Sequence, residues 1–380
     1  MASHLPDKYA EDRLHRYVAH FTRNPSNLSK LDHAAIGYAA EEERKQRQKN
    51  YFAVASDYYD LVSPLYEQGW GQRFHYTPIF PNFSIADSMT AYEYLFAEIA
   101  SLKPDMKVLD LGCGLGGPAR TITKKVGCTI TGITNSAWHV ERGTHLTKEA
   151  GLSDKVKLVR GDFLHLPFED ESFDAAYSVE SLCYSPDPEA VYREVKRVLK
   201  PGAPFTFHDF AMTERFDEKI EEQRKIRNWV EFGNGITAMP WVPEMRGAVK
   251  SAGFELLHEE DMAFRSSPAP WYYGPAGDVW WAWKVPGWED FFRVIKMNSV
   301  FLVLARLLHM VFILVGAAPP EVLELMDIMW YCCRSVAIGG KMGIFTPMYV
   351  FSCRKPLRGS ANGTGKGGAT ATGVALRRQG

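Results

Sequence analysis

The sequence has few cysteines and none at metal-binding spacing. Its six cysteines include one adjacent pair, Cys332 and Cys333, but no C-x-x-C unit. A structural zinc site and a disulfide framework are therefore not indicated, and no metal site is predicted. We expect reduced thiols in a protein that faces the cytosol.

The sequence also has no excess of positive charge and no apolar run in its first residues. Its 44 basic residues are balanced by 45 acidic ones, and the formal net charge is −1. This balance does not favour nucleic acid as a partner. Residues 1–13 lack an apolar run, so we expect no secretory signal.

Long apolar runs are scarce, and one stretch approaches the length of a membrane span. Residues 299–316 read SVFLVLARLLHMVFILVG, with Arg306 and His309 near the middle. An arginine at the centre of a bilayer costs about 2.5–3.5 kcal/mol on insertion scales. We therefore expect a buried helix, or one that lies in a membrane surface, rather than an ordinary span.

Aromatic side chains, in contrast, are plentiful. The chain has 10 Trp, 17 Tyr and 22 Phe, and 46% of its 380 residues are hydrophobic. This composition is typical of a globular chain with a large core. The aromatic share suggests an apolar cavity or interface, although a rigid aromatic core explains it more simply.

Short β-rich runs alternate with helical patterns, which is typical of a doubly wound α/β sheet. We predict seven strands at Lys107–Leu111, Thr129–Ile133, Val156–Arg160, Phe173–Ser178, Phe205–Phe210, Phe254–Asp261 and Pro347–Cys353. About 85 residues separate the last two strands, far more than a turn requires. A helical substrate domain is therefore expected as an insertion before the last strand.

The predicted organisation has six parts. They are a polar N-terminal extension (1–50), a lid and substrate-binding segment (51–88), a cofactor-binding domain (89–261), the helical insertion (262–343), the final strand (344–356) and a tail (357–380). Within the extension, the charged stretch 41–47 is interpreted as a solvated helix face. The Gly/Ala/Thr-rich tail cannot bury enough apolar surface to offset its chain entropy, so we expect it to be disordered.

A glycine-rich turn follows the first predicted strand and opens a helix. It reads Gly112-x-Gly114-x-x-Gly117, with a further glycine at Gly116. Glycines at these positions allow a sharp turn and let the backbone approach a ligand closely. The spacing also fits a dinucleotide site, so the neighbouring side chains must decide which ligand binds.

Three neighbouring features favour S-adenosylmethionine as the cofactor. Asp110 can face the ammonium of a methionine moiety but would repel a pyrophosphate. The second strand leads into Thr134 and Asn135, without the acid that a nicotinamide enzyme places on its ribose. Asp162 and Phe163 offer a carboxylate for the adenine amino group and a ring for its face. The predicted cofactor-binding residues are Asp110, Gly112, Gly114, Gly116, Thr134, Asn135, Asp162 and Phe163.

Segments outside the glycine turn carry a resemblance to one family. Residues 66–76 read YEQGWGQRFHY, and residues 177–186 read YSVESLCYSP. Together with PWYY at 270–273 and GGKMGIFTPMY at 339–349, they resemble the sterol 24-C-methyltransferase family. That family reads Tyr-Glu-x-Gly-Trp-Gly and Glu-Ala-Thr-Cys-His-Ala-Pro in the first two segments. The resemblance covers about residues 50–356 of this chain.

The resemblance implies transfer of a methyl group to the side-chain double bond, at carbon 24, of a sterol. It also implies a Rossmann-like, seven-stranded class I methyltransferase sheet with an N-terminal helical segment. Attack by an alkene would leave positive charge on the substrate, and an aromatic face stabilises such a cation by about 2 kcal/mol when desolvated. The candidate substrate-binding cage is Tyr66, Trp70, Phe74, Tyr184, Trp271 and Tyr272.

The product's double bond requires deprotonation next to the cation. Glu67, His75 and Glu180 are the candidate catalytic residues, each as a base or an electrostatic stabiliser. Glu180 lies where the fourth strand ends, at the carboxyl edge that forms the ligand crevice in such sheets. A bare buried carboxylate there would be costly without a function. The residues alone do not assign the base among the three.

The chain departs from the family pattern on the substrate side and after the second strand. Gln68, Arg73 and Tyr184 replace the usual residues, and NSAWH at 135–139 stands where the family has Asn-Asn-Glu-Tyr-Gln. Two alternatives therefore stay open. One is a C-methyltransferase of another terpenoid or of a quinol lipid, and the other is a non-catalytic sterol-binding protein on the same fold.

The Trp/Tyr-rich run 271–292, followed by the apolar run 299–316, is typical of contact with a lipid phase. Since a sterol acceptor resides in membranes, we expect peripheral association with the cytoplasmic face of the endoplasmic reticulum membrane. The sequence leaves open whether the chain forms a homo-oligomer.

Overall fold

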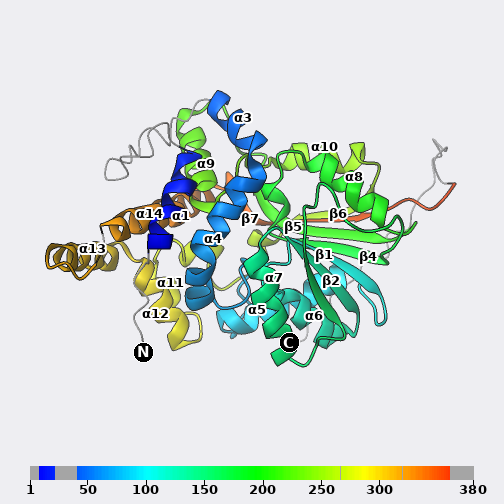
Figure 1. The fold of residues 1–380 in the computed structure, drawn as a ribbon, viewed down its shortest axis with the longest axis horizontal. Coiled ribbons are helices and arrows are strands. Elements are labelled where there is room, and N and C mark those ends of the chain that lie inside the picture. Colours follow the sequence, from blue (N-terminus) through cyan, green and yellow to red (C-terminus); the bar gives the residue numbers. More distant parts are fainter. Residues whose placement is uncertain (1–7, 22–40, 266, 319, 360–380) are drawn as a thin grey trace.

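A seven-stranded sheet forms the centre of the computed structural model, which describes residues 8–21, 41–265, 267–318 and 320–359 (Figure 1). The strand order is β3-β2-β1-β4-β5-β7-β6, and β7 runs antiparallel to both of its neighbours. The strands are β1 (Lys107–Leu111), β2 (Thr129–Thr134), β3 (Val156–Arg160), β4 (Ala175–Val179), β5 (Pro204–Met212), β6 (Glu255–Asp261) and β7 (Phe345–Arg354). All seven predicted strands are confirmed, and their ends differ from the prediction by no more than two residues.

Helices cover both faces of the sheet, as expected for a doubly wound fold (Figure 1). One face carries α5 (Ile85–Ile99), α6 (Gly117–Val126) and α7 (Ala137–Glu149), and the other carries α8 (Pro188–Val198) and α10 (Val242–Ser251). The central strands are buried on both faces because helices cover both, and this explains their nearly continuous apolar sequence.

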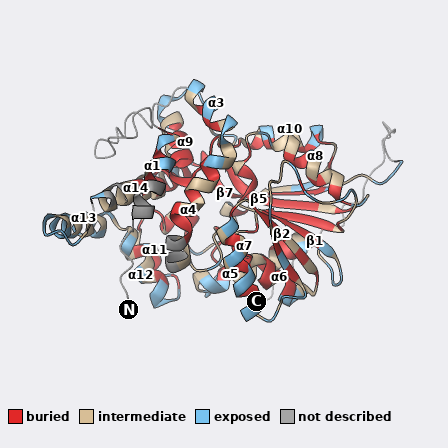
Figure 2. Cartoon of the chain, in the orientation of Figure 1, coloured by how far each residue is buried: buried red, intermediate tan, exposed pale blue. Residues whose placement is uncertain are grey.

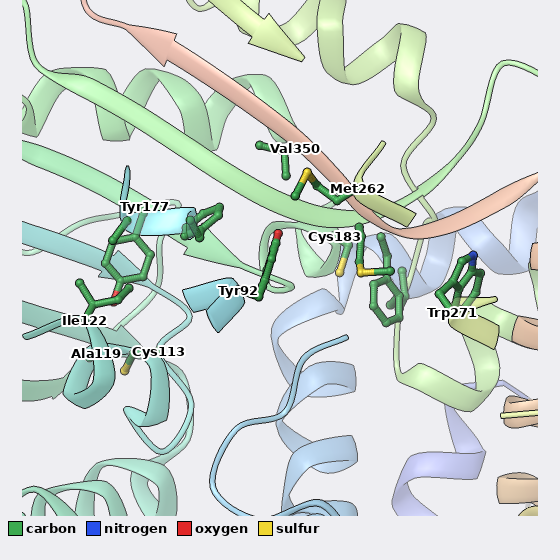
Figure 3. Packing of buried hydrophobic residues seen from close by; sticks show 14 of the residues in the cluster. Tyr92, Cys113, Ala119, Ile122, Tyr177, Cys183, Met262, Trp271 and Val350 are labelled. Atoms are coloured by element: carbon green, nitrogen blue, oxygen red, sulfur yellow. The ribbon is translucent and has the colours of Figure 1, made fainter. Parts of the chain in front are cut away.

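One of the two apolar clusters against the sheet contains polar groups that point to the site. Figure 3 shows part of this cluster, which extends from α6 to Trp271. Tyr92 and Tyr177 lie inside it, and their hydroxyl groups pair with His208 and Asp110. Because a buried polar group needs a partner, these two pairs mark where the core adjoins functional side chains.

Four further helices pack beside the sheet: α1 (Lys8–Ala19), α3 (Glu41–Lys49), α4 (Tyr51–Trp70) and α9 (Glu221–Asn234). Helices α1, α4 and α9 share an apolar cluster of their own. Its members Tyr17, Tyr58 and Phe232 are at most 2% exposed. The predicted N-terminal helical segment is therefore part of the packed body.

The prediction that residues 41–47 form a solvated helix face holds for Glu42, Lys45 and Gln46, which are exposed, but is wrong for Arg44 and Arg47. Arg44 donates hydrogen bonds of 3.1 and 2.7 Å to the two carboxylate oxygens of Glu231 on α9. Arg47 lies 3.5 Å from the same carboxylate, and all three side chains are buried. Arginine is suited to buried ion pairs of this kind. The acid lies 187 residues away along the chain from Arg44, so the local charge pattern could not reveal it.

The helical insertion lies between β6 and β7, as predicted. It consists of the 3₁₀ turns η3 (Met262–Phe264) and η4 (Trp271–Tyr273) and the helices α11 (Val279–Ala282), α12 (Trp288–Met297), α13 (Ser299–Leu314) and α14 (Glu321–Met342). Helix α14 packs against α9 and returns the chain to the sheet. The hydroxyl of Thr346 donates a 2.7 Å hydrogen bond to Oδ1 of Asp261, which holds the two ends of the insertion together.

Helix α13 projects from the body, and most of its surface is exposed (Figures 1 and 2). None of its residues is buried, and Leu307 and Leu314 are 55% and 86% exposed. Of the two alternatives kept for this stretch, the buried helix is therefore wrong, and the helix in a membrane surface stays a prediction. Across the described ranges, no single helix has both the length and the hydropathy needed to cross a membrane. Helices α12 and α13 reach that length and hydropathy only when they are taken together, and the pair is bent by 68°.

All six cysteines are free thiols, and five of them are buried. No disulfide therefore contributes to the described structure. The predicted disordered tail lies outside the described residues from position 360 onward, as does the start of the N-terminal extension, residues 1–7.

Candidate active site

The glycine turn after β1 bends the backbone into the left-handed region at three positions. Gly112, Gly114 and Gly116 have φ angles of 73°, 50° and 72°, which glycine adopts at little cost. A Cβ at Gly112 would lie 2.1 Å from the Cβ of Ser181, whereas one at Gly114 would enter open space. Gly112 therefore allows close packing, and Gly114 leaves room for a ligand. Gly116 is set back from this space and precedes α6 as its N-cap.

A pocket of about 910 Å³ opens in front of this turn, and we call it the cofactor pocket. Seven of the eight residues predicted to bind the cofactor line it, Gly116 being the exception: Asp110, Gly112, Gly114, Thr134, Asn135, Asp162 and Phe163. These residues come together because the carboxyl ends of β1, β2 and β3 meet at one edge of the sheet. The pocket suits a ligand with an ammonium and an aromatic amine, because its wall offers two carboxylates, an amide, an aromatic ring and exposed glycine backbone.

Asp110 is the buried acid of the cofactor pocket. It is 2% exposed, and its Oδ2 accepts a 2.9 Å hydrogen bond from the hydroxyl of Tyr177. Burial raises the pKa of the Asp110 carboxyl to about 7, although the hydrogen bond from Tyr177 lowers it. A buried carboxylate in this state is stabilised by a bound cation, so its position suits the ammonium of the cofactor.

Asp162 is tied to helix α4 by a residue that the sequence analysis missed. Its Oδ1 accepts a hydrogen bond from the backbone N–H of Leu164 (2.8 Å), and its Oδ2 accepts one from the hydroxyl of Tyr51 (2.6 Å). Tyr51, Ala55 and Tyr59 all line the cofactor pocket. Their spacing of four residues places them on one helix face, and this signal could have found them.

His139 on α7 also lines the cofactor pocket and connects α7 to α4. Its Nε2 lies 2.8 Å from the hydroxyl oxygen of Ser63, and its Nδ1 lies 3.4 Å from that of Thr134. Burial lowers the pKa of His139 to about 4. The imidazole is therefore neutral near pH 7 and adds no positive charge beside a cationic cofactor.

Glu180 follows β4, and it combines a strained backbone with a side chain that is only 6% exposed. Its φ of 53° costs a non-glycine residue about 1–3 kcal/mol. Its Oε1 accepts a 2.6 Å hydrogen bond from the backbone N–H of Tyr76 and lies 3.3 Å from Nε2 of His208. Burial raises the pKa of Glu180 to about 8, and the charge of His75 lowers it. A strained, buried acid with a shifted pKa in a cleft is a strong candidate for function.

His75 is a candidate base from its sequence, but the structure occupies both of its ring nitrogens. Nδ1 donates to the carbonyl oxygen of Tyr76 (2.8 Å), and Nε2 lies 3.0 Å from Oε1 of Glu93. Burial lowers the pKa of His75, but the hydrogen bond and charge of Glu93, the charge of Glu180 and the carbonyl of Tyr76 together raise it above the usual value. We therefore assign a protonated ring, with no nitrogen left to accept a proton and a positive charge near Glu180.

Glu67, the third candidate base, lies outside the walls of the cofactor pocket. Its Oε1 accepts hydrogen bonds from Nη2 and Nε of Arg142 on α7, at 2.6 and 3.0 Å. The carboxylate therefore joins the end of α4 to α7 and is partly exposed to solvent. This geometry gives no support to a catalytic role for Glu67.

A second pocket, of about 700 Å³, adjoins the first and extends to α14; we call it the acceptor pocket. The residues that line both pockets are Tyr59, Phe74, His75, Glu180 and Tyr184. Of the predicted aromatic cage, Tyr66, Phe74 and Tyr184 lie in this wall. Glu180 therefore stands at the junction of the two pockets, beside aromatic rings.

The other members of the predicted cage are placed differently. Trp271 and Tyr272 belong to η4 and line neither the cofactor pocket nor the acceptor pocket. Trp271 packs behind the wall, edge-on to the ring of Tyr76, with 5.6 Å between centroids. Direct contact of these two residues with a substrate is therefore not supported. The side chain of Trp70 lies outside the described residues.

The sequence analysis also missed the wall residues that α9 and α14 supply. Asn234, Met329, Cys332 and Cys333 line the acceptor pocket, and Asn234 accepts a 3.0 Å hydrogen bond from Tyr184 at its carbonyl oxygen. Methionine and cysteine on an apolar helix are usually core residues. These residues differ from ordinary core residues only in their position beside Glu180, and that position depends on the tertiary fold.

The two pockets together can bring a charged ligand and an apolar molecule to one buried acid. The rings of Tyr66, Phe74 and Tyr184 offer faces on which positive charge is stabilised. Within the described residues, no group of His, Cys, Asp and Glu is arranged to hold a metal ion.

Two family models match the chain. The model described as a methyltransferase domain matches residues 109–207, which include the glycine turn and Glu180. The model described as the sterol methyltransferase C-terminal matches residues 292–357, which include α13 and α14.

Curated relatives match over most of their length. The sterol 24-C-methyltransferase of Neurospora crassa is 39% identical over 330 residues, 86% of this chain and 86% of the relative. That of Aspergillus fumigatus is 38% identical over 316 residues, 83% of each chain. That of Schizosaccharomyces pombe is 34% identical over 345 residues, 90% of this chain and 88% of the relative.

Solved structures share the fold at low sequence identity. The cyclopropane synthase MmaA2 from Mycobacterium tuberculosis has a TM-score of 0.62 at 13% identity, covering 80% of this chain and 98% of that one. A geranyl diphosphate methyltransferase in complex with S-adenosylmethionine has a TM-score of 0.53 at 16% identity, covering 74% and 98%. The predicted methyltransferase sheet is thereby confirmed.

Proposed function

Since this chain belongs to the sterol 24-C-methyltransferase family, we propose a mechanism in which Glu180 accepts the proton that the acceptor loses. The chain is an S-adenosylmethionine-dependent methyltransferase, and its reaction is the methylation of carbon 24 in a sterol side chain. The family excludes the non-catalytic alternative and favours a sterol over other lipids. The observation that carries the mechanism is the place of Glu180 between the two pockets.

The residues of the cofactor pocket fit S-adenosylmethionine from end to end. Asp110 would pair with its ammonium, Asn135 would bond its ribose, and Asp162 with Phe163 would hold its adenine. The backbone at Gly114 would approach it closely, because no Cβ fills that space. When bound, the cofactor supplies a methyl group on a positively charged sulfur.

The acceptor pocket binds an alkene and stabilises the positive charge that the alkene gains during the reaction. The electron pair of the sterol double bond would form the new bond to the methyl carbon, whose bond to sulfur breaks with its electrons left on S-adenosylhomocysteine. The neighbouring carbon of the sterol then becomes cationic. The faces of Tyr66, Phe74 and Tyr184 stabilise this charge without forming a bond to it. Close positioning must supply much of the rate, because an alkene is a weak nucleophile.

Glu180 then completes the reaction. A C–H bond beside the cation gives its electron pair to a new double bond, and its proton passes to the Glu180 carboxylate. The N–H of Tyr76 and the charge of His75 both favour the ionised carboxylate that this step needs. The Glu180 side chain is 6% exposed, so water has little access to the cation.

A product assay tests the acceptor class. With labelled S-adenosylmethionine, the purified protein is expected to label zymosterol-like or cycloartenol-like acceptors at the side chain, as analysed by mass spectrometry. Saturated analogues of the same sterols serve as the matched control, because they have no double bond to attack. Labelled product from non-sterol lipids alone would overturn the sterol assignment.

We propose further that α12 and α13 attach the protein to a membrane. Arg306, which argues against a spanning helix, turns toward the body and pairs with Asp327 on α14. His309 donates from Nδ1 to the carbonyl oxygen of Ala305, at 2.7 Å. The outward face of α13 is left apolar, with Leu307 and Val311 more than half exposed. Such a helix suits the boundary between lipid headgroups and acyl chains.

Tryptophans beside α13 support the same surface. Trp280, Trp283 and Trp288 are each 67% exposed, and Lys284 lies 4.6 Å from the ring centroid of Trp280. Tryptophan and lysine gather at the level of lipid headgroups. We propose peripheral attachment at the cytoplasmic face of the endoplasmic reticulum, since the acceptor is a membrane lipid.

Charged substitutions on α13 should weaken lipid binding. In the variant L307E/V311E, the fraction that floats with phosphatidylcholine vesicles is expected to fall about tenfold or more, because two glutamates must enter an apolar layer. Leu257→Glu is the matched control, since Leu257 is 52% exposed on β6, outside this surface. Failure of the unmodified protein to float, or equal losses in both variants, would contradict the proposal.

A further inference from the structure

A third cavity, of about 980 Å³, lies between α14 and the junction of α12 with α13. No sequence motif pointed to it, and the mechanism above does not use it. Its wall is mainly apolar and includes Met297, Leu302, Met326 and Trp330. An apolar cavity with a few polar groups in its wall is typical of a small-molecule site.

The third cavity adjoins the acceptor pocket through two side chains. Met329 and Cys333 line both, and they lie one turn apart on the same face of α14. The Cys333 sulfur is 3.9 Å from that of Met297 on α12. Because methionine is unbranched and flexible, this partition can open without moving the backbone.

We propose that the acceptor pocket and the third cavity form one sterol tunnel, with the ring system in the third cavity. This inference rests on the proposed function. Carbon 24 lies near the free end of the sterol side chain, so its reaction beside Glu180 leaves the rings to extend away from the cofactor. The acceptor pocket ends in that direction at Met329 and Cys333, and the third cavity continues beyond them.

The polar side chains in the wall of the third cavity suit the ring end of a sterol, which carries a single hydroxyl group. Ser299, Arg334 and Lys341 line the third cavity and supply hydrogen-bond donors there. Ser299 and Leu302 also begin the exposed helix α13, so this cavity adjoins the surface that we assign to lipid. A sterol could therefore enter side chain first from the membrane.

Filling the third cavity tests the tunnel. Met326→Trp is expected to raise the KM for the sterol about tenfold or more, because the indole ring would fill the space that the sterol ring system needs. The affinity for S-adenosylhomocysteine and vesicle flotation should stay unchanged. Leu257→Trp is the matched control, because Leu257 is 52% exposed on β6, lies outside the membrane surface and lines none of the three pockets. A KM within about twofold of the unmodified value in M326W would overturn the tunnel.

Thiol labelling gives a second measurement on the unmodified protein. Saturating sterol is expected to slow the modification of Cys333 by N-ethylmaleimide about tenfold, whereas S-adenosylhomocysteine alone should leave the rate unchanged. Peptide mass spectrometry measures the rate of modification. Normal turnover of sterol without protection of Cys333 would overturn the tunnel and leave the proposed function intact. Absence of turnover with every sterol would instead overturn the proposed function.

Discussion

Replacement of Glu180 by glutamine is expected to lower turnover by about 10²- to 10⁴-fold, the usual contribution of a general base. Glutamine keeps the size of the side chain and can still accept the hydrogen bond from the N–H of Tyr76. It cannot take a proton from the substrate. Because the chemical step alone is affected, the affinity for S-adenosylhomocysteine should stay within about twofold of the original.

The pH dependence gives this prediction a second readout. Burial raises the pKa of Glu180 to about 8, so the carboxyl is protonated, and inactive as a base, at lower pH. With saturating cofactor, kcat/KM for the sterol should rise with pH and level off at or below about pH 8, because the cationic cofactor favours the ionised acid. The variant E180Q should lack this rise.

Glu67→Gln is the matched control for Glu180. Its carboxylate is held by Arg142 outside the cofactor pocket, so turnover should change by less than about twofold. If E180Q kept its turnover, Glu180 would have no part in proton transfer. If E67Q lost as much turnover as E180Q, the choice between the two acids would be wrong.

Replacement of Asp110 by asparagine is expected to weaken binding of S-adenosylhomocysteine by about 30-fold to several thousand-fold. Truncation of one partner of a buried charge pair costs about 2–5 kcal/mol, and each 1.4 kcal/mol is a factor of about ten. Asparagine can keep the hydrogen bond with Tyr177 but offers no charge to an ammonium. Isothermal titration calorimetry measures the change.

The protonation of Asp110 sets the pH at which this binding fails. Its pKa in the free protein is raised to about 7, so below that pH the carboxyl must lose a proton before it can pair with the ammonium. Affinity should therefore fall as pH drops below about 7, and calorimetry in buffers of different ionisation enthalpy should show release of a proton. Neither effect should occur in D110N.

Asp174→Asn serves as the control for Asp110. Asp174 bonds Lys200 and the backbone of Lys107, at the start of β1, away from the glycine turn. Its replacement should leave cofactor affinity unchanged. Unchanged affinity in D110N, with a folded protein by circular dichroism, would remove Asp110 from the cofactor site.

The cofactor side of the site could be predicted from the sequence because its signals are local. Asp110 and Gly114 lie four residues apart. Asp162 follows β3, and the alternation of strands and helices predicts that the carboxyl end of this parallel strand lies at the same sheet edge. The acceptor side could be predicted only in part. Phe74 and Tyr184 are near conspicuous motifs, whereas Met329 becomes a wall residue only when α14 packs beside the sheet.

The errors have the same physical origin. The charges of Arg44 and Arg47 look solvated until α9 brings Glu231 against them. Glu67 and Glu180 look equivalent as acids in the sequence, and the pairing of Glu67 with Arg142 becomes visible only in the structure. Local spacing specifies helices and turns, but the partner of a charged side chain depends on contacts between distant parts of the chain.

The bond between Thr346 and Asp261 has a consequence for how such enzymes diversify. Because β6 and β7 are adjacent antiparallel strands, the whole insertion is one long hairpin loop whose ends are pinned together. Lengthening a closed loop costs little free energy, about 0.6 kcal/mol for each doubling. The insertion can therefore differ in length between such enzymes at little cost in loop closure, while the sheet edge that carries the cofactor pocket keeps its place.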